Sequence, residues 1–348
     1  MKFLYPLLIF LPATIIGKYM GLSDPLLFIC SSLAIIPLAG LMGKSTDIIS
    51  CFCGQRIGGL LNATFGNATE LIIAFVAMKE GLFDVVKASL AGSVIGNILL
   101  VLGMSFFAGG LKYKRQTFSK DSINVTSSML LLAVLGLSIP AIFTHTLPEG
   151  SLTAQYEGLN IIIAVLMLAV YVSQFIFTFV THRSLYEETV PEEEEHHPVN
   201  LRRAVALLVA STVCIALLSE IFVATVEPMA DSAGLSKTFV GIILVPIIGN
   251  AAEHSSAIIM AVKNKMNAAI EIALGSSLQI ILFVVPVLIL LSLFFTPMSI
   301  VFTPFELVAL VGSVLIANNV VSDGESNWLE GLQLIIVYII IGAAFFFV

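Results

Sequence analysis

The stretch GNATE at residues 66–70 returns as GNAAE at residues 249–253, 183 residues further along the chain. Each copy places one carboxylate, Glu70 or Glu253, inside an otherwise apolar segment. An acidic side chain in a membrane helix costs about 2.5–3.5 kcal/mol on insertion scales, so two acids at equivalent places indicate function. The offset holds beyond the motif, pairing Gly58 with Gly241, Ala74 with Ala257, Gly92-Ser93 with Gly275-Ser276, and Ile98-Leu99 with Ile281-Leu282.

The composition is that of a membrane protein. Of the 348 residues, 58% are hydrophobic and only 11% are charged, and the charges cluster between long uncharged runs. Such a pattern predicts a chain that crosses the bilayer many times. The four cysteines show neither the density of a disulfide scaffold nor zinc-finger spacing. We therefore expect membrane lipid around the chain, no nucleic-acid partner and no separate soluble domain.

Eleven apolar segments can be drawn, and because backbone groups in lipid must be satisfied internally we expect all of them to be helices. The fold class is thus an all-α integral membrane protein. We expect an extra N-terminal helix in residues 1–22, a first five-helix repeat in 25–181, an acidic cytoplasmic linker in 182–200 and a second five-helix repeat in 201–348. The expected spans are 3–22, 25–43, 57–78, 84–110, 122–144, 157–181, 201–225, 236–262, 266–295, 299–321 and 327–348.

Lysine and arginine predict the orientation of these spans. Twelve of them fall at the N-terminus and in the loops from even to odd spans, whereas four fall on the other side: Lys18, Lys79, Lys87 and Lys237. The positive-inside rule then predicts a cytoplasmic N-terminus, an outside C-terminus and a multi-pass protein of the cell membrane. Five spans per repeat is an odd number, so the second repeat runs opposite to the first. Inverted repeats of this kind build alternating-access transporters around a central site.

The repeated motif supplies oxygen ligands. In each copy the asparagine and the glutamate are three residues apart and share a helix face: Asn67 with Glu70, and Asn250 with Glu253. Gly66 and Gly249 precede the asparagines and predict breaks that free backbone carbonyls to bind a cation. Two carboxylates, two amides and several carbonyls suit a hard cation, and we favour Ca²⁺ over Mn²⁺.

Neighbouring spans add polar groups at a similar depth, but no further acid. With only two acids, the empty site carries two negative charges, which one Ca²⁺ or two protons would neutralise. Exchange of Ca²⁺ for H⁺ therefore has a plausible physical basis. His254, beside Glu253, either bonds a polar neighbour or contacts the site. The candidate supporting residues are Ser93, Asn97, Ser276, Ser277, Gln279 and His254.

Structural explanations remain open for several of these features. A lone asparagine or serine in a membrane helix often only bonds a neighbouring helix, and the Gly92-x-x-x-Gly96 pattern is as typical of helix packing as of function. The linker acids are typical of a solvated connection, although they are also candidates for a low-affinity cation or pH sensor. This regulatory candidate comprises Glu192, Glu193, Glu194, Glu195, His196 and His197.

The two motifs, together with GSSLQ at residues 275–279, resemble the Ca²⁺/cation antiporter superfamily, and more narrowly its bacterial calcium/proton exchanger branch. The resemblance covers essentially the whole chain. It implies Ca²⁺ extrusion driven by the proton gradient, with Glu70 and Glu253 as ligands that are alternately protonated. It also implies gating by spans 2 and 7 and a homotrimer. Sodium-coupled relatives carry further acids in spans 4 and 9, where this chain has Asn97 and Gln279.

The sequence thus predicts a secondary antiporter that exports cytoplasmic Ca²⁺ in exchange for H⁺ and that needs no cofactor. The alternatives are a Na⁺- or K⁺-coupled Ca²⁺ exchanger and, less favoured, a passive cation channel. An enzyme is not expected, because the His-Glu-x-x-His motif and paired aspartates of intramembrane hydrolases are absent from the sequence.

Overall fold

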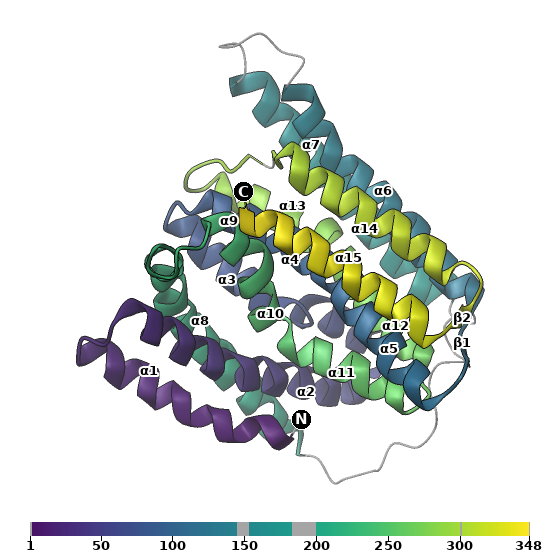
Figure 1. Ribbon diagram of the computed structural model, residues 1–348, viewed down its shortest axis with the longest axis horizontal. Helices are drawn as coiled ribbons and strands as arrows, with labels where there is room; N and C mark the ends of the chain where they lie inside the picture. The colour runs from purple at the N-terminus through teal and green to yellow at the C-terminus, as the bar shows by residue number, and fades with distance from the viewer. Residues whose placement is uncertain (1, 145–152, 183–199, 300, 348) are drawn as a thin grey trace.

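Long apolar helices dominate the computed structural model, which describes residues 2–144, 153–182, 200–299 and 301–347 (Figure 1). The first half contains η1 (Lys2–Ile9), α1 (Phe10–Tyr19), α2 (Asp24–Phe65), α3 (Ala68–Lys79), α4 (Phe83–Ile95), η2 (Gly96–Val101), α5 (Leu102–Lys112), α6 (Lys120–Thr144), α7 (Thr153–Ile176) and η3 (Phe177–Thr181). The second contains α8 (Leu201–Ala233), α9 (Lys237–Phe239), η6 (Val240–Leu244), α10 (Val245–Gly249), α11 (Ala251–Val262), α12 (Met266–Gln279), η7 (Ile280–Val284), α13 (Val285–Ser292), α14 (Pro304–Val321) and α15 (Trp328–Phe347).

Eight helical segments of the described chain are long and apolar enough to cross a membrane, and a ninth arises if the bent pair 237–249 and 251–262 is one span. The expected first span is a shorter apolar helix, Leu4–Tyr19. The expected third span is divided between the end of α2 and α3. The chain is therefore an all-helical, multi-span membrane protein, and the number eleven stays a prediction.

Helix α2 differs from the expected helix–loop–helix over residues 25–78, because residues 44–56 are helical as well. The segment nevertheless turns back on itself. The Ser50 hydroxyl donates a hydrogen bond of 3.0 Å to the carbonyl oxygen of Gly58, whereas eight residues of straight helix would separate the two by about 12 Å. A tight helical turn thus replaces the loop and still reverses the chain between the two expected spans.

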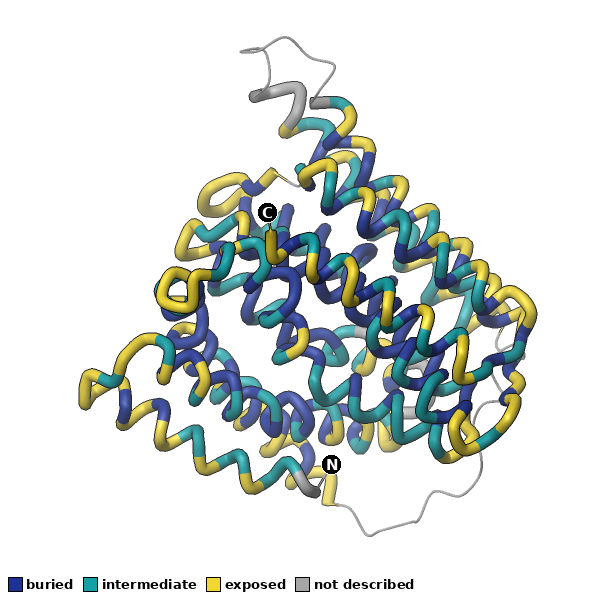
Figure 2. The backbone as a smooth tube through the Cα atoms, in the orientation of Figure 1, coloured by how far each residue is buried: buried dark blue, intermediate teal, exposed yellow. Residues whose placement is uncertain are grey.

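The helices that surround the motif form the buried centre of the protein, as the dark blue tube in Figure 2 shows. In the segments Phe83–Lys112 and Met266–Ser292, 72% and 67% of the most apolar window is buried inside the protein, against 11% for Glu157–Thr181. The two central segments also share a detail. The π-turn η2 spans residues 96–101 and the π-turn η7 spans residues 280–284, so their ends are separated by the 183-residue offset of the repeat and their starts by one residue more. Such turns often occur at functional sites.

Three connections lie together at one end of the molecule: α5–α6, α11–α12 and α14–α15. Lys112 Nζ donates to the Val262 carbonyl at 2.9 Å, and Gln116 Nε2 donates to the Asn264 side chain at 2.9 Å. The short antiparallel strands β1 (Gln116–Thr117) and β2 (Glu325–Ser326) pair at this end, at the right of Figure 1. This pair is a small addition to the expected all-helical fold, formed where two connections run side by side.

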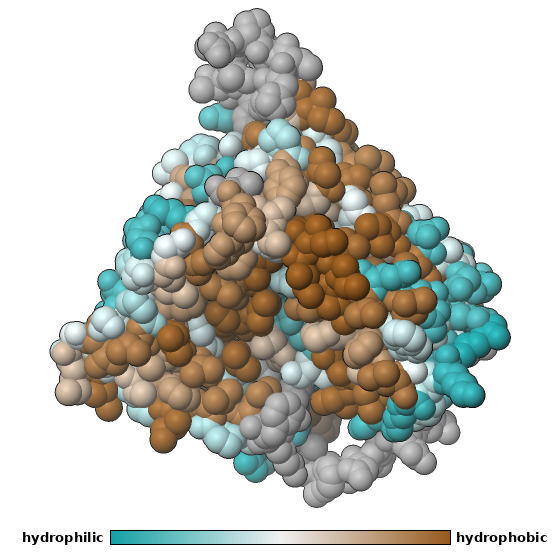
Figure 3. Space-filling view, viewed as in Figure 1, coloured by the Kyte–Doolittle hydropathy of each residue, from teal (hydrophilic) through white to brown (hydrophobic). Residues whose placement is uncertain are grey.

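The opposite end joins the α3–α4, α8–α9 and α13–α14 connections, whose residues line one cavity. Helix α3 therefore ends where the 30-residue segment Phe83–Lys112 begins, and α11 ends where that segment finishes. The motif-bearing helices α3 and α11 consequently run in opposite directions. Figure 3 shows apolar surface across the middle of the molecule, with hydrophilic surface gathered towards the left and right edges.

Candidate cation site

A helix break in each repeat positions the two glutamates. Helix α2 ends at Phe65 and α3 begins at Ala68, while α10 ends at Gly249 and α11 begins at Ala251 with a bend of 61°. The asparagine is the non-helical residue in both copies, with φ/ψ of −102°/25° at Asn67 and −92°/6° at Asn250. The break recurs in the first copy although that copy has no counterpart of Pro246. Each glutamate lies in the first turn of the helix that follows.

Each asparagine is held by a side chain from the other repeat. Asn67 Nδ2 donates to Gln279 Oε1 at 2.6 Å, and Asn250 Nδ2 donates to Ser93 Oγ at 3.0 Å. Asn250 Nδ2 also donates to the Pro246 carbonyl at 2.9 Å. Both amide nitrogens are thus occupied away from the glutamates, which fixes the orientation of the amides and leaves their oxygens available.

Four buried oxygen atoms at the breaks accept no hydrogen bond from the described part of the chain. They are Asn67 Oδ1, Glu70 Oε2, Asn250 Oδ1 and Glu253 Oε2, two from each repeat. Buried polar atoms in folded proteins are almost always paired, so unpaired oxygens at both helix breaks call for a ligand. An all-oxygen set with two carboxylates is the donor chemistry that Ca²⁺ prefers.

The two carboxylates lie close enough to interact electrostatically, and the Ser276 hydroxyl is within hydrogen-bonding reach of Glu253. Glu70 also lines a small cavity of about 10 Å³ between α3, α4 and α10, room for about one water molecule. Among the described residues no group of three or more His, Cys, Asp or Glu side chains is placed to hold a metal ion. The site therefore offers two acids, supplemented by amide, hydroxyl and backbone oxygens.

The remaining predicted residues lie at different distances from this arrangement. Gly249 is in direct contact range of Glu70, because a Cβ at Gly249 would lie 3.5 Å from Glu70 Oε1; a Cβ at Gly66 would lie 3.4 Å from Gln279 Oε1. Ser277 is fully buried, and its hydroxyl donates to Ala273 of its own helix at 2.9 Å. Asn97 and His254 are buried, and each has a ring or amide nitrogen with no hydrogen-bond partner in the described chain.

Two features of the site escaped the sequence analysis. Ser89 lines the cavity beside Glu70, and the Pro246 carbonyl holds Asn250. Ser89 stands four residues before Ser93, a spacing that shares a helix face and was available as a signal. The linker residues of the regulatory candidate, 192–197, lie outside the described residues.

Comparison with known proteins identifies the family of the chain. The sodium/calcium exchanger protein family matches residues 23–180 and 203–347. The Ca(2+)/H(+) antiporter ChaA of Bacillus subtilis (strain 168) is 47% identical over 96% of both chains, and the Ca(2+)/H(+) antiporter of Aphanothece halophytica is 43% identical over 99% of this chain and 96% of its own. The solved structure of native YfkE is 43% identical, covers 99% of this chain and 100% of its own, and superposes with a TM-score of 0.85.

The fold and these relatives define the class of the protein as a membrane antiporter. The chain belongs to the sodium/calcium exchanger family. The expected resemblance to the bacterial calcium/proton exchanger branch is confirmed by relatives that bear the name Ca(2+)/H(+) antiporter. Because the family consists of transporters, the prediction that the chain is not an enzyme is also confirmed.

Proposed function

We propose that the protein exports cytoplasmic Ca²⁺ in exchange for H⁺, by alternating access to one site that contains Glu70 and Glu253. The observation that carries this proposal is the set of four unpartnered buried oxygens, contributed equally by the two helix breaks. Asn67 and Asn250 complete the binding set, with Ser93, Ser276 and Gln279 as supporting residues. Ca²⁺ and H⁺ are transported ions here, and no cofactor is needed.

The coupling follows from charge. Without a ligand, two ionised carboxylates would place two negative charges in a buried site, a state too costly to carry through a change of access. One Ca²⁺ or two protons removes that charge. The loaded forms can therefore change access while the empty form cannot, which is the requirement for exchange rather than leak.

The inverted repeat supports the alternating-access part of the proposal. Helices α3 and α11 carry the two copies of the motif and run in opposite directions, and both break at the asparagine. Two similar half-sites facing opposite ends of the molecule allow the site to open to either side by related movements. This arrangement also argues against a passive channel, which would need a continuous pore rather than two mirrored half-sites.

The direction of export rests on the distribution of lysine and arginine, which predicts a cytoplasmic N-terminus and an outside C-terminus. The contacts described above support the assignment of the connections to two opposite ends of the molecule. The connections rich in these residues, 112–120 and 263–265, meet at one end, whereas Lys87 and Lys237 line the cavity at the other. We propose the cell membrane as the location and, by resemblance, a trimer as the assembly.

The test is transport by the purified protein in vesicles. An imposed pH gradient should drive accumulation of radioactive Ca²⁺ at clamped sodium, and a sodium or potassium gradient at clamped pH should not. Asn97 and Gln279 are uncharged where sodium-coupled relatives carry acids, which is why we expect protons to be the counter-ion. Uptake driven by sodium alone would overturn the proton-coupled assignment, and Ca²⁺ flux without any counter-ion would favour a channel.

The support that Gln279 gives Asn67 leads to a further prediction. In Gln279→Leu the buried Asn67 amide loses its acceptor, and an unsatisfied buried donor costs about 1–3 kcal/mol. We expect the KM for Ca²⁺ to rise roughly tenfold, in line with that cost, because the amide turns away from the site. Ser277→Ala is the matched control on the same helix, since the Ser277 hydroxyl is bonded within its own helix. An unchanged KM in Gln279→Leu would contradict the supporting role.

A further inference from the structure

A cavity of about 430 Å³ lies at the end of the molecule opposite the strands β1 and β2. Its walls include the start of α4, the start of α9 and the start of α14. Charged side chains reach it from each of these helices and from the end of α8, namely Asp84, Lys87, Glu227, Lys237 and Glu306. The transport site described above uses none of them.

The cavity is aligned with the transport site. The same two helical segments that wall it, 83–95 and 237–249, continue into the small cavity beside Glu70, which is lined by Ser93 and Pro246. Between the two cavities these segments touch closely. A Cβ at Gly241 would lie 2.6 Å from the Ala88 side chain, and a Cβ at Gly92 would overlap the Ile242 carbonyl. Close contact between these two segments at Ala88, Gly92 and Gly241 therefore lies between the larger cavity and the site.

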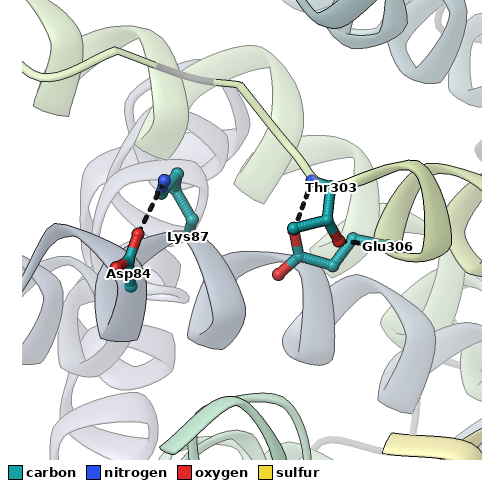
Figure 4. Close-up of polar contacts among 4 residues, drawn as sticks. All are labelled: Asp84, Lys87, Thr303 and Glu306. Carbon is teal, nitrogen blue, oxygen red and sulfur yellow. Dashed lines mark hydrogen bonds and ion pairs between the residues drawn. The ribbon is translucent and has the colours of Figure 1, made fainter. Parts of the chain in front are cut away.

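Most charges in the cavity are neutralised or screened. Lys237 and Glu227 form an ion pair at 2.8 Å. The Glu306 carboxylate accepts a hydrogen bond of 2.7 Å from the Thr303 backbone and so caps α14. Figure 4 shows this capping pair near the ion pair between Asp84 and Lys87 on α4. The side chain of Asp84 is 94% exposed, so solvent weakens its field.

Lys87 is different in both depth and exposure. Its side chain is only 19% exposed, and it lies one helical turn deeper along α4 than Asp84. Six residues of helix, a rise of about 9 Å, separate the backbone of Lys87 from that of Ser93 at the transport site. Lys237 stands nine residues before Pro246, about 13 Å by the same measure. The repeat offers no counterpart, because the equivalent position in the second half is the apolar Ile270.

We propose that this cavity is the mouth through which the site opens to the outside, and that Lys87 weakens the hold on Ca²⁺ at that mouth. The inference rests on the proposed Ca²⁺/H⁺ exchange. An ammonium group that a divalent cation passes at about 9 Å in a water-filled passage lowers the local affinity for that cation by roughly fivefold. Lys87 thereby assists release and opposes rebinding on one face only, since the opposite face has Ile270.

The experiment measures the KM for Ca²⁺ separately at each face, in everted and right-side-out vesicles under an opposing pH gradient. In Lys87→Met the KM at the face of the cavity should fall about fivefold, while the KM at the face of strands β1 and β2 stays as in the wild type. Lys87→Arg keeps the charge and should match the wild type. Asp84→Asn removes the partner carboxylate and should change the KM at that face slightly in the opposite direction.

Lys79→Met is the control, because Lys79 belongs to the same end but does not line the cavity. If Lys87→Met does not reach the membrane, Lys87→Gln serves as a second uncharged variant. An unchanged KM at both faces, or an equal change at both, would overturn the role of Lys87 while leaving exchange intact. Wild-type vesicles that show no proton-driven uptake at either face would instead reject the proposed function itself.

Discussion

Glu70→Gln and Glu253→Gln should each abolish proton-driven Ca²⁺ uptake, with a loss of at least a hundredfold. Glutamine keeps the shape and most hydrogen bonds of glutamate but can neither balance Ca²⁺ nor release a proton. Each variant therefore loses half of the charge that Ca²⁺ neutralises and one of the two groups that carry protons. The measurement is uptake of radioactive Ca²⁺ into vesicles under an imposed pH gradient, normalised to the amount of reconstituted protein.

The controls for this experiment are acids elsewhere in the helices. Glu306→Gln changes a buried acid that lines the larger cavity but not the transport site, and Glu157→Gln changes an exposed one. Both should retain transport. The double variant Glu70→Gln/Glu253→Gln should also be inactive but folded, because two neutral amides remove the repulsion between the buried charges. Persistent gradient-driven uptake in both single variants would contradict the two-glutamate mechanism.

Gly92→Val should destabilise the protein strongly. A Cβ at this position would overlap the Ile242 carbonyl oxygen and lie 2.7 Å from its Cα, so two central helices would have to separate. Overpacking a close-packed interior costs about 1–3 kcal/mol and at times more, and backbone cannot move aside as a side chain can. We expect the midpoint of thermal unfolding in detergent to fall by roughly 4 °C, using the size scaling of Tm for a chain of this length.

Gly96→Ala is the matched control on the same segment, since nothing lies within 4 Å of a Cβ there. It should leave both folding and transport unchanged. The two glycines of the Gly92-x-x-x-Gly96 pattern therefore differ, because Gly92 lies in close contact with another helix and Gly96 does not. A Gly92→Val protein as stable as the wild type would show that α4 and η6 are less tightly packed than their geometry indicates.

Local patterns in the sequence predicted the helical membrane fold. The apolar segments indicated most helices, and the repeated motif pointed to Glu70 and Glu253 as candidate ligands, which stay a prediction. The helix break at the motif could also be predicted in part, since a glycine before the asparagine indicates a break. The helical turn at residues 51–57 could not be predicted, because a polar connection between two spans is compatible with either a loop or a helix.

The sequence could not predict which side chains form hydrogen bonds with one another. Ser93, Ser277 and Gln279 all have the right depth and polarity, yet Ser93 and Gln279 hold asparagines while Ser277 bonds its own helix. The difference depends on the rotation of each helix about its axis, which is set by packing across the whole interior. The cavity at Lys87 is likewise a product of three helix ends that are distant in the sequence.

The bond between Asn67 and Gln279 joins residues 212 positions apart. A ribosome completes Asn67 long before Gln279, so the first motif enters the bilayer with an amide donor whose final acceptor has not yet been made. The same is true of Ser93 and Asn250, which are 157 positions apart. The site is therefore among the last parts of the protein to form. A chain released early would hold half of the ligands and none of the bonds that orient them.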